Sequence, residues 1–174
     1  MPVNKALFLP QYEKKTWDEA NYAISYLLKK REPSTEGLRQ HAHHLSVLFN
    51  RLFPLLDRLC RLTCRFCPDP CCLAATIWFD LKDMVMLHLL NRDIPFAQPL
   101  SRQEDHCRYL GIRGCTLPRH DRPFICTLYL CPPQMRILRK EPDDLKLFSD
   151  TISSIKEKRN DLEHEFIRIT SGRA

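Results

Sequence analysis

The stretch Cys64-Arg-Phe-Cys67-Pro-Asp-Pro-Cys71-Cys72 places four cysteines within nine residues and decides how the rest of the chain is interpreted. The two-residue spacer between Cys64 and Cys67 lets both sulfurs face one ion while backbone amides point toward them. Cys71 and Cys72 are adjacent, so their side chains diverge and rarely serve one ion together. One of the two is therefore expected to point to a second site or to be buried as a hydrophobic side chain.

A second group, Cys107, Cys115, Cys126 and Cys131, lies within 25 residues and ends in Arg122-Pro-Phe-Ile-Cys126-Thr-Leu-Tyr-Leu-Cys131-Pro. Eight thiols at these spacings favour a bound metal or an iron–sulfur cluster over chance burial. A thiol redox protein without metal is the alternative, although no Cys-x-x-Cys motif lies between a strand and a helix as in the thioredoxin pattern. Cys60, one helical turn before Cys64, lies outside both groups and is expected to be a core thiol.

The rest of the chain bears on the compartment in which these thiols act. The apolar run at the start is short, and no apolar stretch reaches the length of a membrane span. The sequence therefore predicts a soluble, cytoplasmic protein that does not contact a membrane. In a reducing compartment, clustered cysteines bind metal or carry out redox chemistry more often than they form disulfides.

The net charge of +6 is concentrated near the second cysteine group, where residues 101–140 carry eight basic and three acidic side chains. One interpretation is a surface that binds nucleic acid. The other is compensation for the negative charge of thiolate-liganded metal, and we favour it because the basic residues coincide with the cysteines. Arg122 is the best candidate for a cofactor-binding arginine, since a guanidinium group can donate to sulfur or to a loop carbonyl.

The histidines are weaker candidates for metal ligands. His41 fills a gap in the apolar pattern of a predicted helix, and His43 and His44 are expected at the surface. His106 could replace a neighbouring thiol, and His120 lies in the basic loop, but both are expected to be surface residues.

Helices are predicted on both sides of the cysteines. The first runs from Thr16 to about Arg31, with a capping box over residues 16–19. The second starts near Ser34 and has apolar residues at alternating steps of three and four up to Leu62, with Pro54 expected to kink or split it. The third is predicted over 73–91. A last long helix follows Pro142 with the same three-four pattern, interrupted only by a buried-face arginine, Arg159.

Between the third and last helices, residues 91–131 show no regular apolar period and are predicted to be irregular. The fold class that follows is mainly α: a small helical bundle with an irregular cysteine-rich region stapled by metal. We expect one domain over 1–174, in which a cysteine core at 60–132 is flanked by helical regions 16–59 and 142–171. The two long apolar patterns are expected to pack within one molecule rather than between copies.

The order of the cysteine elements resembles the YkgJ-type cysteine-cluster family, whose members are described as zinc- or iron-chelating proteins and include flagellin lysine N-methylases. The resemblance covers about residues 60 to 132. The matching residues are Cys64, Cys67, Cys71, Cys72, Cys107, Gly114-Cys115, Arg122-Pro123 with Cys126, and Cys131. Three residues precede the Cys71-Cys72 pair where the family pattern has two, so either member of the pair can take the family position.

The leading prediction is a metal-centre protein that binds an iron–sulfur cluster, with [4Fe–4S] favoured, or zinc through these eight cysteines. Cys-Pro steps and the flanking Phe66, Phe124 and Tyr129 favour the cluster, because aromatic side chains would keep it dry. The first alternative is a non-catalytic zinc module that binds protein or nucleic acid through the arginine-rich loop. Whether the chain is an enzyme is left open: the resemblance implies redox chemistry or protein lysine methylation, yet no G-x-G-x-x-G loop is present. A protein partner or protein substrate is favoured over nucleic acid, and nothing indicates the oligomeric state.

Overall fold

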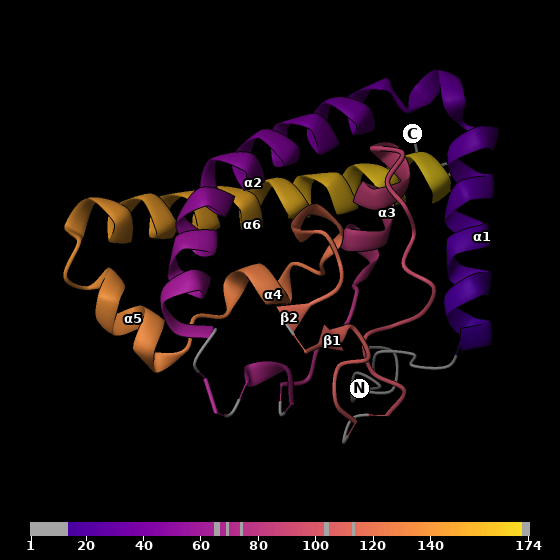
Figure 1. The fold of residues 1–174 in the computed structure, drawn as a ribbon. Helices are drawn as coiled ribbons and strands as arrows, with labels where there is room; N and C mark the ends of the chain where they lie inside the picture. Colours follow the sequence, from indigo (N-terminus) through magenta and orange to yellow (C-terminus); the bar gives the residue numbers. More distant parts are fainter. Residues whose placement is uncertain are drawn as a thin grey trace, which may run out of the picture.

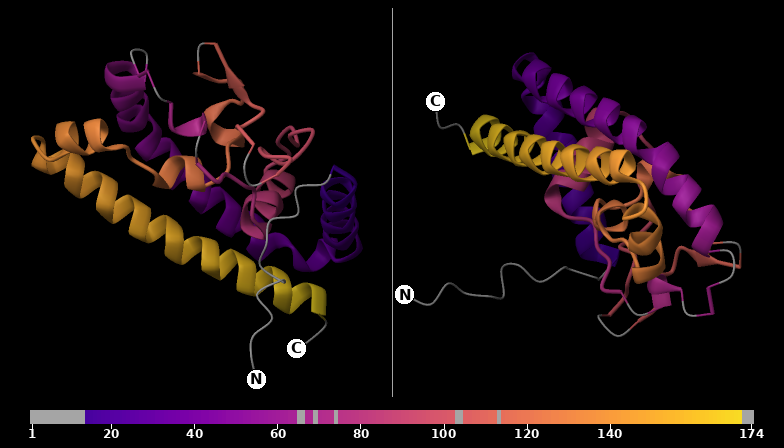
Figure 2. Two further views of the ribbon diagram at one scale, coloured as in Figure 1. Left: turned by 90° about the horizontal axis from the view of Figure 1, so that it is seen from below. Right: turned by 90° about the vertical axis from the view of Figure 1, so that its left-hand side faces the viewer.

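The computed structural model describes residues 14–64, 67, 68, 70–73, 75–102, 105–112 and 114–171. Its frame is a pair of long helices, α2 (Glu36–Thr63) and α6 (Pro142–Ser171), which run side by side (Figure 1). The cysteine-rich segment gathers on one side of this pair, as the two further views also show (Figure 2). The fold is mainly α-helical, which confirms the predicted class.

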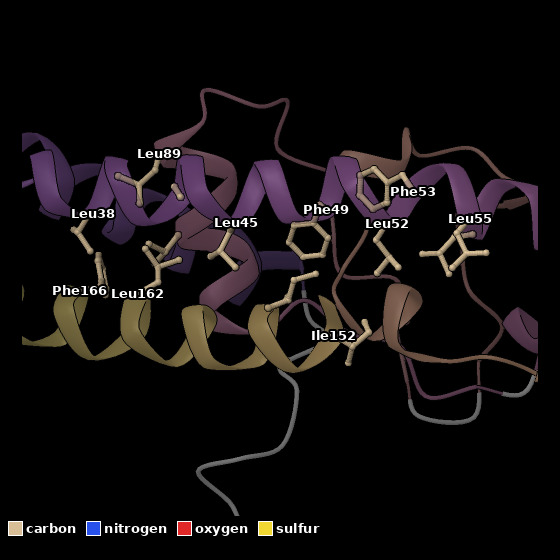
Figure 3. Packing of buried hydrophobic residues seen from close by; sticks show 14 of the residues in the cluster. Leu38, Leu45, Phe49, Leu52, Phe53, Leu55, Leu89, Ile152, Leu162 and Phe166 are labelled. Atoms are coloured by element: carbon tan, nitrogen blue, oxygen red, sulfur yellow. The ribbon is translucent and has the colours of Figure 1, made fainter. Parts of the chain in front are cut away.

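The α2–α6 pair is held together by the apolar side chains that the three-four pattern predicted. Leu45 and Leu52 of α2 and Leu162 of α6 are fully buried, and Figure 3 shows the two rows facing each other. Each such side chain contributes about 1.5–3 kcal/mol when it is removed from water. The two helices therefore bury apolar side chains along the length of their shared interface.

α2 continues through Pro54 as one helix, so of the two outcomes expected at this proline the helix is bent rather than split (Figure 1). Figure 1 shows that the helix changes direction in its second half, which is the effect of an internal proline that removes one hydrogen bond. α2 ends at Thr63, so Cys60 lies in its last turn and Cys64 caps its end. The first cysteines of the chain are thus fixed to the most firmly packed helix.

α1 (Lys14–Lys30) precedes α2 and is joined to it by the short helix η2 (Glu32–Ser34). The predicted bounds of α1 are confirmed to within two residues, but the predicted capping box is wrong, because Thr16 lies inside the helix. Trp17 fixes α1 to the rest of the molecule: its ring packs on Phe79 with centroids 5.3 Å apart, and its indole N–H donates to the carbonyl of Pro95 at 2.9 Å.

The third helix is shorter than predicted. Residues 75–80 are extended after the short helix η4 (Cys71–Leu73), and α3 spans only Leu81–Leu89. The reason is the cap at Asp80. Its carboxylate accepts the backbone N–H of Asp83 at 2.9 Å, and the carboxylate of Asp83 accepts the backbone N–H of Asp80. This reciprocal pair fixes the start of the helix at Leu81, so the apolar residues before it form an extended strip.

Residues 91–131 follow an irregular path, as predicted, with little secondary structure of their own. Two short antiparallel strands, β1 (Leu110–Gly111) and β2 (Gly114–Cys115), are followed by η5 (Arg119–Asp121) and α4 (Ile125–Leu128). α5 (Pro132–Leu138) then leads into α6. Gly114 has a φ of 104°, a value that favours glycine, and it allows the tight turn between the strands.

Side-chain hydrogen bonds replace regular structure in part of this segment. The amide group of Gln98 exchanges bonds of 2.8 and 3.0 Å with the backbone of Phe79, and the hydroxyl of Tyr109 donates to the carbonyl of Ala97 at 2.7 Å. All four residues are buried. Within the ranges given above, no helix is both long and apolar enough to cross a membrane.

Candidate thiol metal centre

The nine cysteines all lie in described positions, and the structure groups them differently from the sequence. Four of them meet in one small apolar cluster, which we call the apolar thiol group: Cys72, Cys107, Cys115 and Cys126. Three others surround one glutamine side chain, and we call them the Gln134 thiol group: Cys60, Cys64 and Cys131. The adjacent Cys71 and Cys72 differ in exposure, because Cys71 is exposed and Cys72 packs against the apolar cluster. Their thiols share a hydrogen bond, however, rather than pointing apart as expected.

The apolar thiol group is assembled from three separate pieces of chain. Cys107 is only 8% exposed, and its backbone N–H donates to the carbonyl of Cys72 at 3.1 Å, which joins η4 to the segment before β1. Cys115 lies on β2 and pairs with Leu110, and Cys126 lies in α4. Buried side chains complete the cluster: Ile77, Leu100 and Tyr109.

Burial sets the acid–base behaviour of these thiols. It is the main cause that raises the pKa of Cys126, and the neighbouring Cys115 and Cys107 raise it further, while Arg122 acts in the opposite direction. Burial likewise raises the pKa of Cys107. The pKa of Cys72 is raised chiefly by its hydrogen bond with the Cys71 thiol. Without a cation, these groups stay protonated at neutral pH, and a metal that binds them must displace their protons.

The donor set of the apolar thiol group fits a soft metal. Four thiols lie in apolar surroundings, and the neighbouring Cys115 and Cys107 disfavour ionisation of Cys126. A bound cation would stabilise the ionised thiol. Among the residues that the structure describes, however, no three His, Cys, Asp or Glu side chains are placed so that they hold a metal ion as they stand. The four cysteines pack in one cluster, but their side chains do not converge on one point in this structure.

The Gln134 thiol group lies at the end of α2. Gln134 is 6% exposed, and its side-chain amide contacts the sulfurs of Cys60 and Cys64, each at 3.7 Å from Nε2. The backbone N–H of Gln134 donates to the sulfur of Cys131, and its Oε1 accepts the Cys131 N–H at 3.3 Å. One residue thus touches three thiols that are up to about 70 residues apart in sequence.

Charge in the Gln134 thiol group is set by a shared thiol–thiol hydrogen bond and by one arginine. The bond with Cys64 lowers the pKa of Cys60 to about 5 and raises that of Cys64. Arg119 selects Cys60 as the ionised partner, because its Nη2 donates to the Cys60 sulfur at 3.6 Å. The Nε of the same guanidinium group donates to Asp57 at 2.6 Å, which fixes it in this position.

Cys67 and Cys71 are exposed, and in sequence they lie between Cys64 of the Gln134 thiol group and Cys72 of the apolar thiol group. The backbone N–H of Cys67 donates to the carbonyl of Cys64 at 3.3 Å. Hydrogen bonding with the Cys72 thiol lowers the pKa of Cys71 to about 6, whereas the nearby Cys60 raises it. Cys71 is therefore close enough to interact with both groups.

Two different arginines make the two kinds of hydrogen bond that were considered for Arg122. Arg122 donates from Nε to the carbonyl of Leu117 at 3.0 Å, which is the loop-carbonyl bond considered for it. The arginine that donates to sulfur is Arg119 instead. The guanidinium group of Arg108 lies over the ring of Phe96, 5.6 Å from its centroid. These contacts show that several guanidinium groups of the basic segment bind other residues of the protein.

The histidines considered as ligands lie on α2, directly before Cys107 and in η5. His43 and His44 are exposed on α2, and His41 is half-buried there. His106 contacts the carbonyl of Leu73 through Nδ1, and the ring of His120 packs edge-on against Phe53 at 4.8 Å. In the described structure, these contacts are to a backbone carbonyl and to an aromatic ring rather than to a thiol.

One network that positions the site was not predicted. Arg159 of α6 is 2% exposed and donates to Asp83 at 2.6 Å and to Asp80 at 2.7 and 2.8 Å. Asp83 also accepts the backbone N–H of Phe124 at 3.1 Å, two residues before Cys126. The signal in the sequence was Arg159 itself, the polar interruption of an apolar pattern, but its partners could not be identified there.

Comparison with known proteins gives no match: no protein-family model, no curated protein and no solved structure is similar to this chain. The resemblance to the YkgJ type stays a prediction that rests on the cysteine order alone. The functional argument is therefore made from the geometry of the two thiol groups.

Proposed function

We propose that this chain is a metal-binding protein whose apolar thiol group holds zinc or an iron–sulfur cluster. The observation that supports it is the meeting of Cys72, Cys107, Cys115 and Cys126 in one apolar cluster, although they are spread over 55 positions of the sequence. Apolar side chains of almost any kind could fill such a cluster. Four thiols from three separate segments are the set that a soft metal requires.

The bound centre would tie together three segments that already pack in the apolar cluster. η4 brings Cys72, the segment that ends in β2 brings Cys107 and Cys115, and α4 brings Cys126. A zinc ion there would act as a structural crosslink, and an iron–sulfur cluster would add one-electron chemistry. The chain's own contribution is to exclude water with Ile77, Leu100 and Tyr109 and to give up the thiol protons.

Phe124 and Tyr129, two of the aromatic residues expected to favour a cluster, are not among the side chains packed in the apolar thiol group. Phe124 packs on Phe49 and under Arg159 in the main core, and Tyr129 is 51% exposed. Phe66 lies outside the described residues. The choice between zinc and iron–sulfur therefore rests on experiment.

The test is the metal content of protein purified without oxygen and without chelators. We expect zinc, or iron with an equal amount of acid-labile sulfide, bound in a fixed ratio to the chain, with an absorption band near 400 nm in the iron–sulfur case. Cys126→Ser should lose that metal, because serine replaces a thiolate ligand at a site that has no substitute nearby.

The control for Cys126→Ser is Thr127→Ser, a mild change at the next buried position of α4, which should keep the full metal content. Metal-free wild-type protein that unfolds at the same temperature before and after metal is added would overturn the proposal. A reversible disulfide in such protein would favour the thiol redox alternative. Binding of the metal-loaded chain to nucleic acid would instead support the non-catalytic zinc module.

A further inference from the structure

We propose that the Gln134 thiol group is a second, separate metal site, and that Cys60 is one of its ligands. This inference rests on the proposed function only in taking the chain to be a metal-binding protein, since the cysteines involved are different. Sequence pattern alone set Cys60 aside as a core thiol. The structure instead places its sulfur at the end of α2 beside Cys64, within reach of two donor side chains.

The first argument is convergence on one buried residue. Gln134 contacts Cys60 and Cys64 through its side-chain amide, and Cys131 through its backbone N–H. Cys60 and Cys64 are one turn apart on a helix, which puts both thiols on the same face. The exposed Cys71, which follows Cys64 closely in the chain, is the candidate for a fourth ligand. In the described structure these side chains do not yet converge as metal ligands, but four thiols are the donor set that zinc or iron takes.

The second argument is the presence of hydrogen-bond donors directed at sulfur. Gln134 and Arg119 both donate to Cys60, and Arg119 is held in place by Asp57. Donors of this kind orient thiolate ligands and reduce their negative charge in metal sites. A buried thiol that served only for packing would have no use for a guanidinium group that already has a carboxylate partner.

The third argument separates this site from the apolar thiol group. Cys71 and Cys72 are consecutive and their thiols share a hydrogen bond, yet Cys72 packs in the cluster with Cys107 and Cys126, whereas Cys71 is exposed. The surroundings also differ: apolar side chains line one group, and a glutamine and an arginine line the other. Two centres of different character follow, one buried and one near the surface.

The experiment measures metal centres per chain in the wild type and in two variants. Wild-type protein should hold two centres, and Cys60→Ser and Cys126→Ser should each hold one. Arg61→Ala, an exposed change on the same turn of α2 as Cys60, is the matched control and should keep both. Far-UV circular dichroism establishes that each variant is folded before its metal is counted.

Each outcome bears on a different claim. If Cys60→Ser keeps the wild-type metal content while Cys126→Ser loses metal, the second site is wrong and the proposed function stands. If either variant loses all metal although it is folded, one shared centre replaces the two. Wild-type protein with no metal at all overturns both. Loss in Cys60→Ser with Cys126→Ser unaffected leaves the Gln134 site and removes the apolar one.

Gln134 offers a second readout that does not remove a ligand. In the Cys126→Ser background, where only the Gln134 site should remain, Co²⁺ reports thiolate ligation through its sulfur-to-metal charge-transfer band. Gln134→Met keeps the side-chain volume but removes the donor, and we expect affinity for Co²⁺ to fall about 10- to 100-fold with a shifted band. An unchanged band and affinity would contradict the assignment of Gln134 as a positioning residue.

Discussion

Arg159 shows how much one buried charge controls at the scale of a residue. Its guanidinium group lies 4.5 Å from the Phe124 ring centroid and binds both Asp80 and Asp83 in a place that apolar packing would otherwise fill. A buried ion pair of this kind contributes little net stability, but removal of one partner leaves the others unpaired in the core. Its second effect is indirect, because Asp83 also holds the backbone before Cys126.

We expect Arg159→Met to destabilise the protein by about 3–5 kcal/mol, because Asp80 and Asp83 lose the cation that compensates them. The measurement is urea denaturation at neutral pH with the metal bound. Arg168→Met on the same helix is the control, since its pair with Glu165 is exposed and should cost less than about 1 kcal/mol. Equal effects in the two variants would mean that the buried network contributes no more than a surface pair.

At the scale of an element, the start of α3 is a capping box buried under α6. Burial raises the pKa of Asp83 to about 6, and Arg159 lowers it only in part. As the pH rises above about 4, the unfolded chain loses this proton while the folded chain keeps it until about pH 6. The folded state is therefore favoured by Asp83 most strongly below pH 4, and this contribution is lost between about pH 4 and pH 6.

The prediction is a difference in slope between the wild type and Asp83→Asn, which cannot titrate. From pH 4 to pH 6 the free energy of unfolding of the wild type should fall, relative to that of Asp83→Asn, by on the order of 2–3 kcal/mol. Chemical denaturation at pH 4, 5 and 6 measures both. Parallel curves over this range would show that Asp83 is already ionised in the folded state at pH 4.

The elements also show what the sequence could and could not predict. α2 and α6 were predictable because a long amphipathic pattern specifies both a helix and the face it buries. The extended strip at 75–80 was missed because its residues are as apolar as those of a helix. The cap at Asp80 is what determines where the helix begins. The pairing of Cys72 with the second cysteine group and of Cys131 with the first depends on the path of an irregular segment, which no local pattern encodes.

At the scale of the whole molecule, the long helices and the cysteine-rich segment have different sources of stability. α2 and α6 bury continuous apolar faces, whereas the described residues between 91 and 131 bury scattered side chains such as Leu100 and Tyr109 and add a few side-chain hydrogen bonds. Ordering this segment costs about 1–2 kcal/mol of backbone entropy per residue. Removal of metal should therefore affect the segment far more than the helices.

We expect chelation to leave most of the helical circular dichroism intact while amides of residues 105–131 exchange faster. Residues 95–98 should keep more protection, because Trp17, Phe79 and Tyr109 bond to this stretch. Hydrogen exchange followed by mass spectrometry, with and without metal, resolves the three regions. If residues 105–131 are equally protected in both states, packing alone orders them and the metal has another role.

The crossing of the two thiol groups has a consequence for how the protein is made. Cys60 leaves the ribosome long before Cys131, which Gln134 contacts in the folded protein. Cys72 likewise leaves it before Cys107, Cys115 and Cys126, the other members of its group. Neither group can form from a contiguous stretch of the chain. The thiols that are synthesised first therefore stay accessible until the later ones have been added. Closing a loop of about 70 residues also costs more entropy than closing a short one. In the proposed scheme, metal loading follows the emergence of residue 131, and the thiols have to stay reduced until then.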